Sequence, residues 1–172
     1  AVGTLNERKN LGVLIDAFAE VARRNRDLRL VIAGSPDRDA ERIRERIRVL
    51  GLEARTVLLG FASDAELPGI VAGAAVLVFP SLFEGYGMPV TEAIAAGTPV
   101  VVSSDPSLDE AAGPSVARFA PLDAIALAEA IMSVVRTAGH QSAVDRNSHP
   151  TLRTWDRSGS DFANVIEATV RL

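Results

Sequence analysis

Short apolar runs alternate with helix-like segments along most of this 172-residue chain. Four runs read as strands that are apolar throughout: "LRLVIAGS", "TVLLGF", "AVLVFPS" and "PVVVSS". Segments with helical spacing lie around them, at residues 10–24, 39–51, 63–74, 88–97 and 121–137. Strands without a polar face must be buried on both sides, which a parallel sheet between two layers of helices provides. The pattern therefore predicts an α/β fold, a Rossmann-like doubly wound parallel sheet.

Composition narrows the class of protein. Cysteine is absent and the net charge is −4, so disulfide and thiol chemistry are excluded and nucleic-acid binding is disfavoured. No apolar run is long enough to cross a membrane and no signal peptide is visible, so we expect a cytoplasmic location. We expect residues 1–172 to form one domain cut from a longer protein. Residues 138–172 would be a tail packed on that domain by Trp155, ending in a helix.

Residues of unusual type gather where the predicted strands end. Arg8 and Lys9 follow the first predicted strand at residues 2–4, Gly34 and Ser35 follow the next, and Gly60 is followed by Phe61. The segment 83–93, "FEGYGMPVTEA", follows another strand. Since parallel α/β sheets bind ligands at the carboxyl ends of their strands, we expect a binding site there.

The segment 83–93 combines a glycine turn, a helix start and two carboxylates. Gly85 and Gly87 free the backbone for a tight turn, and a helix begins at Met88 and Pro89. Amides at such a start favour an anion such as phosphate; here the donors would be those of Gly87, Met88, Val90 and Thr91, because Pro89 has no N–H. The two acids should bind something other than phosphate. Glu92 can bind ribose hydroxyls, and Glu84 a second polyol or a developing positive charge.

Arg8 and Lys9 can supply the positive charge that a diphosphate needs beyond one helix end. Lys9 is the only lysine among eighteen basic residues. Arginine offers a planar fork and lysine a compact charge. A solvated loop pair is the competing interpretation for these two cations, as surface acids are for Glu84 and Glu92. A ligand with a ribose, a phosphate group and then a second sugar is a nucleotide-sugar.

The segment "FPSLFEGYGMPVTEAIAAGTPVVVSS" resembles the donor site of retaining glycosyltransferases with the two-domain GT-B architecture. More narrowly, it is similar to the group 1 type, which includes many bacterial mannosyl- and glucosyltransferases and the glycogen synthases. The family motif of two glutamates with seven residues between them matches Glu84 and Glu92, and "VGTLNERKNL" resembles the opening of the family's C-terminal domain. The resemblance covers residues 1–136 well and the tail loosely.

The resemblance implies a donor-binding domain of a retaining hexosyltransferase. Glu84, Arg8 and Lys9 would be catalytic, with Glu84 on the donor sugar and the two cations on the departing diphosphate. Glu92 would bind the ribose, and Phe61 would flank the base. The other residues implied in substrate binding are Gly3, Gly85, Tyr86, Gly87, Met88, Pro89 and Val90. We expect no metal and no cofactor beyond the nucleotide-sugar donor, and slightly favour GDP-mannose over UDP-sugars.

Two departures from the family pattern matter. Many relatives carry arginine directly after the first glycine, where this chain has Thr4, so Arg8 would take that role. The family's N-terminal acceptor-binding domain is not in this sequence, so we expect donor binding with little transfer. The full enzyme could be peripheral on the inner membrane face. Two alternatives stay open: a stand-alone nucleotide-binding regulatory module, and a sugar-nucleotide epimerase-like domain.

Overall fold

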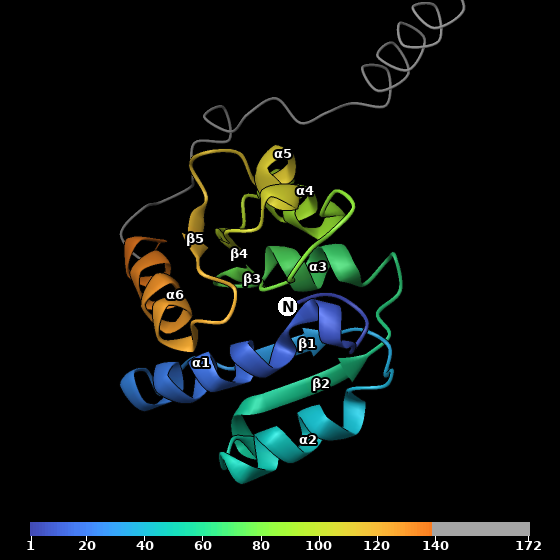
Figure 1. Cartoon of the computed structure of the whole chain (residues 1–172), viewed down its shortest axis with the longest axis vertical. Coiled ribbons are helices and arrows are strands. Elements are labelled where there is room, and N and C mark those ends of the chain that lie inside the picture. The colour runs from blue at the N-terminus through green and yellow to red at the C-terminus, as the bar shows by residue number, and fades with distance from the viewer. Residues whose placement is uncertain (139–172) are drawn as a thin grey trace, which may run out of the picture.

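The computed structural model describes residues 1–138 of the chain as an α/β domain (Figure 1). Five strands are present: β1 (Leu30–Ala33), β2 (Thr56–Gly60), β3 (Leu77–Phe79), β4 (Val100–Ser103) and β5 (Ala117–Phe119). The α-helices are α1 (Leu11–Arg24), α2 (Ala40–Val49), α3 (Leu67–Ala72), α4 (Met88–Ala95), α5 (Asp109–Ala112) and α6 (Ala124–Ala138). Three short 3₁₀ helices complete the described part: η1 (Glu7–Lys9), η2 (Glu53–Arg55) and η3 (Pro106–Leu108).

All strand pairing is parallel, but hydrogen bonding divides the strands into two sheets. One sheet has the order β1-β2 and the other β3-β4-β5. The N-terminal segment lies between β1 and β3 (Figure 1) and pairs along β1. There the Ala33 amide donates to the Ala1 carbonyl at 3.0 Å, and the Gly3 amide donates to the Ala33 carbonyl at 2.8 Å. The strand expected at residues 2–4 is thus one isolated bridge, too short to join the two sheets into a continuous ladder.

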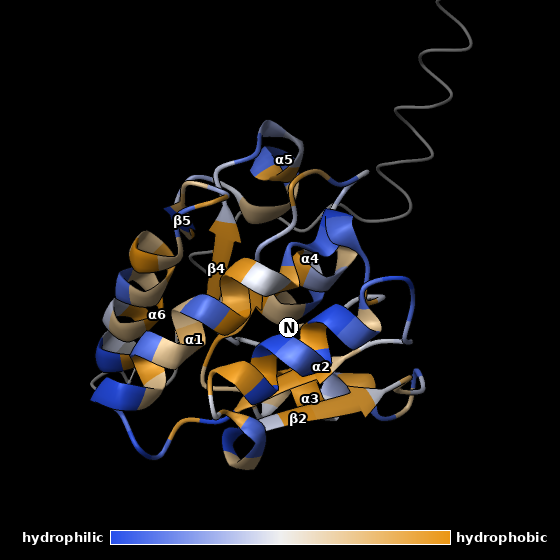
Figure 2. Ribbon diagram, turned by 60° about the horizontal axis from the view of Figure 1, so that its bottom comes forward, coloured by the Kyte–Doolittle hydropathy of each residue, from blue (hydrophilic) through white to orange (hydrophobic). Residues whose placement is uncertain are grey.

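Helices cover both faces of the strands, as a doubly wound fold requires. Alternate residues of β3 and β4 enter opposite hydrophobic clusters: Val78 and Val101 face one, and Leu77 and Val100 the other. The first cluster contains the apolar faces of α1, α2 and α6, and the second those of α3, α4 and α5. Figure 2 shows β2 and β4 as largely hydrophobic ribbons, whereas α1 and α2 alternate hydrophobic and hydrophilic residues. The predicted fold class is confirmed.

Local signals marked the end of α2, whereas α3 is shorter than the expected range of 63–74 and begins at Leu67. Gly51, predicted to close α2, has φ +65°, and the next amide, of Leu52, donates to the Ile47 carbonyl at 3.0 Å. Glu66 accepts a hydrogen bond from the Ser63 amide at 2.9 Å, which forms half of the predicted capping box before α3.

The expectations for the C-terminal tail, including Trp155 and the last helix, lie outside the described residues. Strand β5 and helices η3 and α5 were not predicted. Within residues 1–138, no helix has the length and apolar character needed to span a bilayer.

A close backbone crossing ties the N-terminal segment to the end of β1. A Cβ placed on Gly34 would lie 1.9 Å from the Gly3 carbonyl oxygen, and the Gly34 amide donates to the Gly60 carbonyl at 2.7 Å.

We predict that Gly34→Ala destabilises the fold by about 1–3 kcal/mol, because backbone atoms would have to move. Gly69→Ala is the control, since its Cβ meets nothing within 4 Å and alanine favours helix α3. Urea denaturation measures both; equal stability of the two variants would contradict the crossing.

Candidate functional site

Three charged side chains form an ion cluster at the carboxyl end of the strands. The Lys9 ammonium donates to Glu84 Oε1 at 2.7 Å, and Arg8 pairs with the other carboxylate oxygen of Glu84. The Lys9 and Glu84 side chains are 10% and 9% exposed, and that of Arg8 is 35% exposed. We call these three residues the ion cluster. It joins two loops that are 75 residues apart in sequence.

Backbone contacts hold the two cations in place. The Leu82 amide, in the loop after β3, donates to the Arg8 carbonyl at 2.9 Å. Helix η1 ends at Asn10, whose backbone is left-handed at φ +51°. The Asn10 side-chain amide donates to the carbonyls of Pro80, at 3.1 Å, and of Pro121. The loops that follow β3 and β5 therefore fix the position of η1.

The Lys9 side chain occupies a space that is open because its neighbour Gly3 has no side chain. Its ammonium lies 4.6 Å from the centre of the Phe79 ring, a cation–π distance. A Cβ on Gly3 would lie 2.5 Å from Lys9 Cε, and Gly3 has φ +140°. Gly3, expected among the donor-binding residues, therefore makes room for the lysine.

Glu84 is positioned from its backbone by a residue that the sequence did not single out. The Glu84 amide donates to Ser107 Oγ at 2.9 Å. Ser107 in turn donates its hydroxyl to Asp105, which also accepts the Ser107 amide at 3.0 Å. This turn after β4 opens η3. Its sequence, "DPS", has the composition of many surface turns and carries no signal of a site.

The two glutamates of the motif lie in different electrostatic surroundings. Burial alone would raise the pKa of Glu84, but its hydrogen bond with Lys9, the Ser81 hydroxyl, the charge of Lys9 and its contact with Arg8 lower that pKa below the ordinary value. Burial and the nearby charge of Asp64 raise the pKa of Glu92. The Glu92 residue is exposed on α4, and within residues 1–138 no ion pair links it to the ion cluster.

The start of α4 follows the ion cluster along the chain. Gly87 adopts φ +91°, and a Cβ there would lie 2.9 Å from Leu108, so the turn needs glycine. The Val90 amide donates to the Gly87 carbonyl at 2.8 Å, and the Val90 side chain is fully buried. This differs from the expectation that the Val90 amide serves a ligand, because the first turn of the helix already uses it. Pro89 has no N–H, so Gly87 and Met88 remain as candidate donors.

The other predicted residues divide by exposure. Phe61, Gly85 and Met88 are exposed, with 76% of Phe61 and 52% of Met88 open to solvent. Tyr86 is half-buried and packs on the hydrophobic cluster of α4 and α5. Tyr86 therefore supports the turn, whereas Phe61 and Met88 stay open to a ligand.

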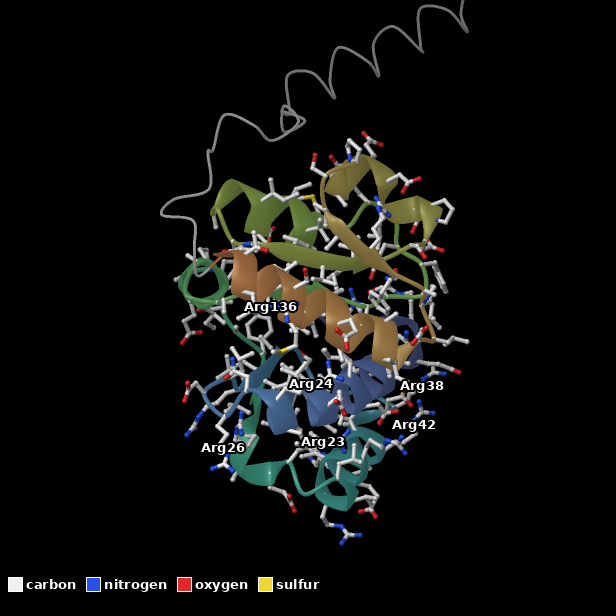
Figure 3. The ribbon with its side chains drawn as sticks, turned by 90° about the vertical axis from the view of Figure 1, so that its left-hand side faces the viewer. Arg23, Arg24, Arg26, Arg38, Arg42 and Arg136 are labelled. Atoms are coloured by element: carbon white, nitrogen blue, oxygen red, sulfur yellow. The ribbon has the colours of Figure 1, made fainter. Side chains whose placement is uncertain are left out.

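Most arginines lie away from the ion cluster and have partners of their own. Figure 3 shows Arg23 and Arg24 on α1, near Arg136 of α6. Arg24 pairs with Glu20 and Glu129, and Arg46 of α2 donates to both carboxylate oxygens of Asp16 at 2.6 and 2.8 Å. Arginines of α1 and α2 are thus paired with carboxylates at the surface of the domain.

An apolar cavity of about 310 Å³ lies at the opposite end of the strands. Its lining includes the first residues of β1 and β3, Leu30 and Leu77, together with Phe18 and Ile70. We place the candidate site at the ion cluster, because a polar ligand needs the charges and amides found there.

Comparisons with known proteins point to one family. The sequence model described as "Glycosyl transferases group 1" matches residues 1–149. An uncharacterized glycosyltransferase of Methanocaldococcus jannaschii is 30% identical over 99% of this chain and 45% of its own length. The GDP-mannose-dependent alpha-(1-6)-phosphatidylinositol dimannoside mannosyltransferase of Mycobacterium tuberculosis is 30% identical over 96% of this chain and 42% of its own length. The chain thus spans less than half the length of these relatives.

Solved structures agree with the fold. HepE of Anabaena in complex with UDP-glucose superposes with a TM-score of 0.71 at 25% identity, over 80% of this chain and 39% of that one. The sucrose-phosphate synthase of Thermosynechococcus elongatus gives a TM-score of 0.77 at 23% identity, over 97% of this chain and 45% of that one.

We predict that the ion cluster makes stability depend on pH. The pKa of Glu84 is lower in the folded chain than in the unfolded one, so its contribution is fully present above the unfolded pKa, about 4.3. That contribution is lost as pH falls through the folded pKa. Glu84→Gln should therefore cost about 1–3 kcal/mol at pH 7 and progressively less below pH 4.

Chemical denaturation across this pH range measures the effect. Glu129→Gln is the control, because it removes an exposed partner of Arg24 and should cost much less at pH 7. A Glu84→Gln cost that did not change between pH 7 and pH 3 would contradict the assigned ion pairs.

Proposed function

Because this chain belongs to the glycosyl transferases group 1 family, we propose that it is the donor-binding part of a retaining hexosyltransferase. The supporting observation is the ion cluster itself: two cations and a carboxylate at the carboxyl end of parallel strands, followed directly by the glycine turn into α4. This is where ligands bind in open α/β sheets.

Each part of the site takes one part of a nucleotide-sugar. Arg8 and Lys9 neutralise the diphosphate, and the amides of Gly87 and Met88 at the start of α4 bind its oxygens. Glu84 accepts hydrogen bonds from hydroxyls of the donor sugar, and Glu92 from the ribose. Phe61, exposed in the loop after β2, flanks the base.

In the proposed transfer the sugar keeps its anomeric configuration, as the resemblance to retaining glycosyltransferases implies. The bond between the sugar C1 and the diphosphate oxygen breaks, and Arg8 and Lys9 stabilise the negative charge that grows on the diphosphate. The acceptor oxygen bonds to C1 on the same face, and its proton passes to the departing phosphate oxygen. Glu84 stabilises the positive charge that develops on the sugar.

GDP-mannose is the favoured donor. The mycobacterial relative is named as GDP-mannose-dependent, whereas the solved HepE complex contains UDP-glucose. The family resemblance implies that the acceptor site lies in an N-terminal domain, and this chain spans 45% and 42% of the length of these two relatives. The residues described here therefore supply donor binding, and transfer requires the longer protein.

We predict that GDP-mannose or UDP-glucose raises the unfolding temperature of the chain, because a ligand that binds only the folded state stabilises it. Lys9→Ala should weaken binding about 30-fold or more, because a partly buried cation on the diphosphate is lost. Glu92→Ala should weaken binding about tenfold, through lost hydrogen bonds to ribose.

Arg44→Ala is the control. It removes an exposed arginine of α2, away from the ion cluster, and should leave the affinity unchanged. Isothermal titration calorimetry measures all four proteins. A folded wild-type chain that bound neither donor would refute the proposed function.

A further inference from the structure

Both cations proposed for the diphosphate pair with Glu84 in the structure. One carboxylate oxygen accepts from Lys9 at 2.7 Å, and the other pairs with Arg8. The Glu84 and Lys9 side chains are about nine-tenths buried, so water screens their attraction weakly. A diphosphate must therefore compete with an internal anion for the same two partners.

The backbone at Glu84 is held in place on both sides of the ion cluster. Its amide is bound to Ser107 Oγ at 2.9 Å, and Arg8 also donates to the neighbouring Phe83 carbonyl at 3.3 Å. When an anion takes the two cations, the carboxylate stays beside it. Glu84 then needs new hydrogen-bond donors, because a largely buried carboxylate without partners is unfavourable.

We propose that Glu84 makes the site select a nucleotide that carries a sugar over the free nucleoside diphosphate. This inference rests on the proposed function. The hydroxyls of a bound hexose supply the donors that Glu84 loses when Arg8 and Lys9 turn to the diphosphate. A free diphosphate supplies none, and its terminal phosphate adds a further negative charge next to the carboxylate.

Selection of this kind favours release of the product after transfer. The ion cluster has a net charge of +1 from two cations and one anion. While the sugar is attached, its hydroxyls separate the phosphate charge from the carboxylate. Once the sugar has left, like charges face each other, and Glu84 regains its two cations only when the diphosphate departs.

The test compares the affinity for a free nucleoside diphosphate with that for the nucleotide-sugar of the same base, in three proteins. Calorimetry at fixed ionic strength measures GDP and GDP-mannose, and UDP and UDP-glucose, with the wild type, Glu84→Gln and Glu7→Gln. Glu84→Gln keeps the shape and removes the charge, so it should bind the free diphosphate roughly tenfold more tightly. It should bind the nucleotide-sugar no more tightly than the wild type.

Glu7→Gln is the matched control. It removes a negative charge from the same helix, η1, and within residues 1–138 Glu7 forms no ion pair with the cluster. The ratio of the two affinities should therefore shift about tenfold in Glu84→Gln and stay unchanged in Glu7→Gln. A Glu84→Gln variant that lost affinity for the free diphosphate, or kept the wild-type ratio, would overturn the inference.

The wild type alone provides a second readout if the variant does not fold. It should bind the nucleotide-sugar more tightly than the free diphosphate of the same base, although the diphosphate carries more charge. The reverse order would overturn the inference while leaving the proposed function intact. A wild type that bound none of the four ligands would refute the donor site and the inference together.

Discussion

The arrangement of this domain depends on one carboxylate bound by two cations. Glu84 holds Arg8 and Lys9, and so fixes the end of the N-terminal segment against the loop after β3. Strand pairing alone leaves these regions in separate sheets, because the isolated bridges of the N-terminal segment go to β1 and to Pro36 just after it. The ion cluster and the backbone contacts around it join the two halves at the carboxyl end of the strands, where we propose that the donor binds.

The scaffold around the cluster explains why the two cations differ. Lys9 is enclosed between the Phe79 ring and the space left by Gly3, so its ammonium has little freedom. Arg8 is more exposed, at 35%, and lies 5.8 Å from the centre of the exposed Phe83 ring. A buried point charge and a more exposed planar fork suit different parts of a diphosphate. The only lysine of the chain thus lies in an enclosed space, where a bulkier guanidinium group would have less room.

The sequence was sufficient to predict the fold class, and it placed the charged residues at the strand ends. Apolar strands and helical spacing predict a covered parallel sheet, and in such a sheet the segments that follow the strands meet at one edge. The sequence did not show that Glu84 pairs with Arg8 and Lys9. The sequence analysis assigned all three residues to a ligand. Internal partners depend on side-chain directions that spacing does not encode.

Other features were missed for equally physical reasons. Strand β5 has three residues and includes Arg118, so neither its length nor its pattern marks it as a strand. Ser107 acts through its hydroxyl on the backbone of a distant residue, and such contacts leave no periodic trace. The amide of Val90 was expected to face a ligand, but helix geometry uses it in the first turn of α4. The sequence was sufficient to predict most of the helices and strands around the site. It was not sufficient to predict the hydrogen bonds of Ser107 and of the Val90 amide within it.

Lys9 offers the most direct measurement, because it is the only lysine in the chain. Isotope-labelled lysine would give a single side-chain ammonium signal from the ion cluster in an NMR spectrum. On titration with a nucleotide-sugar, the proposed site predicts that this signal shifts in proportion to the bound fraction measured by calorimetry. Binding seen by calorimetry with no change in the Lys9 signal would place the ligand elsewhere and contradict the assignment.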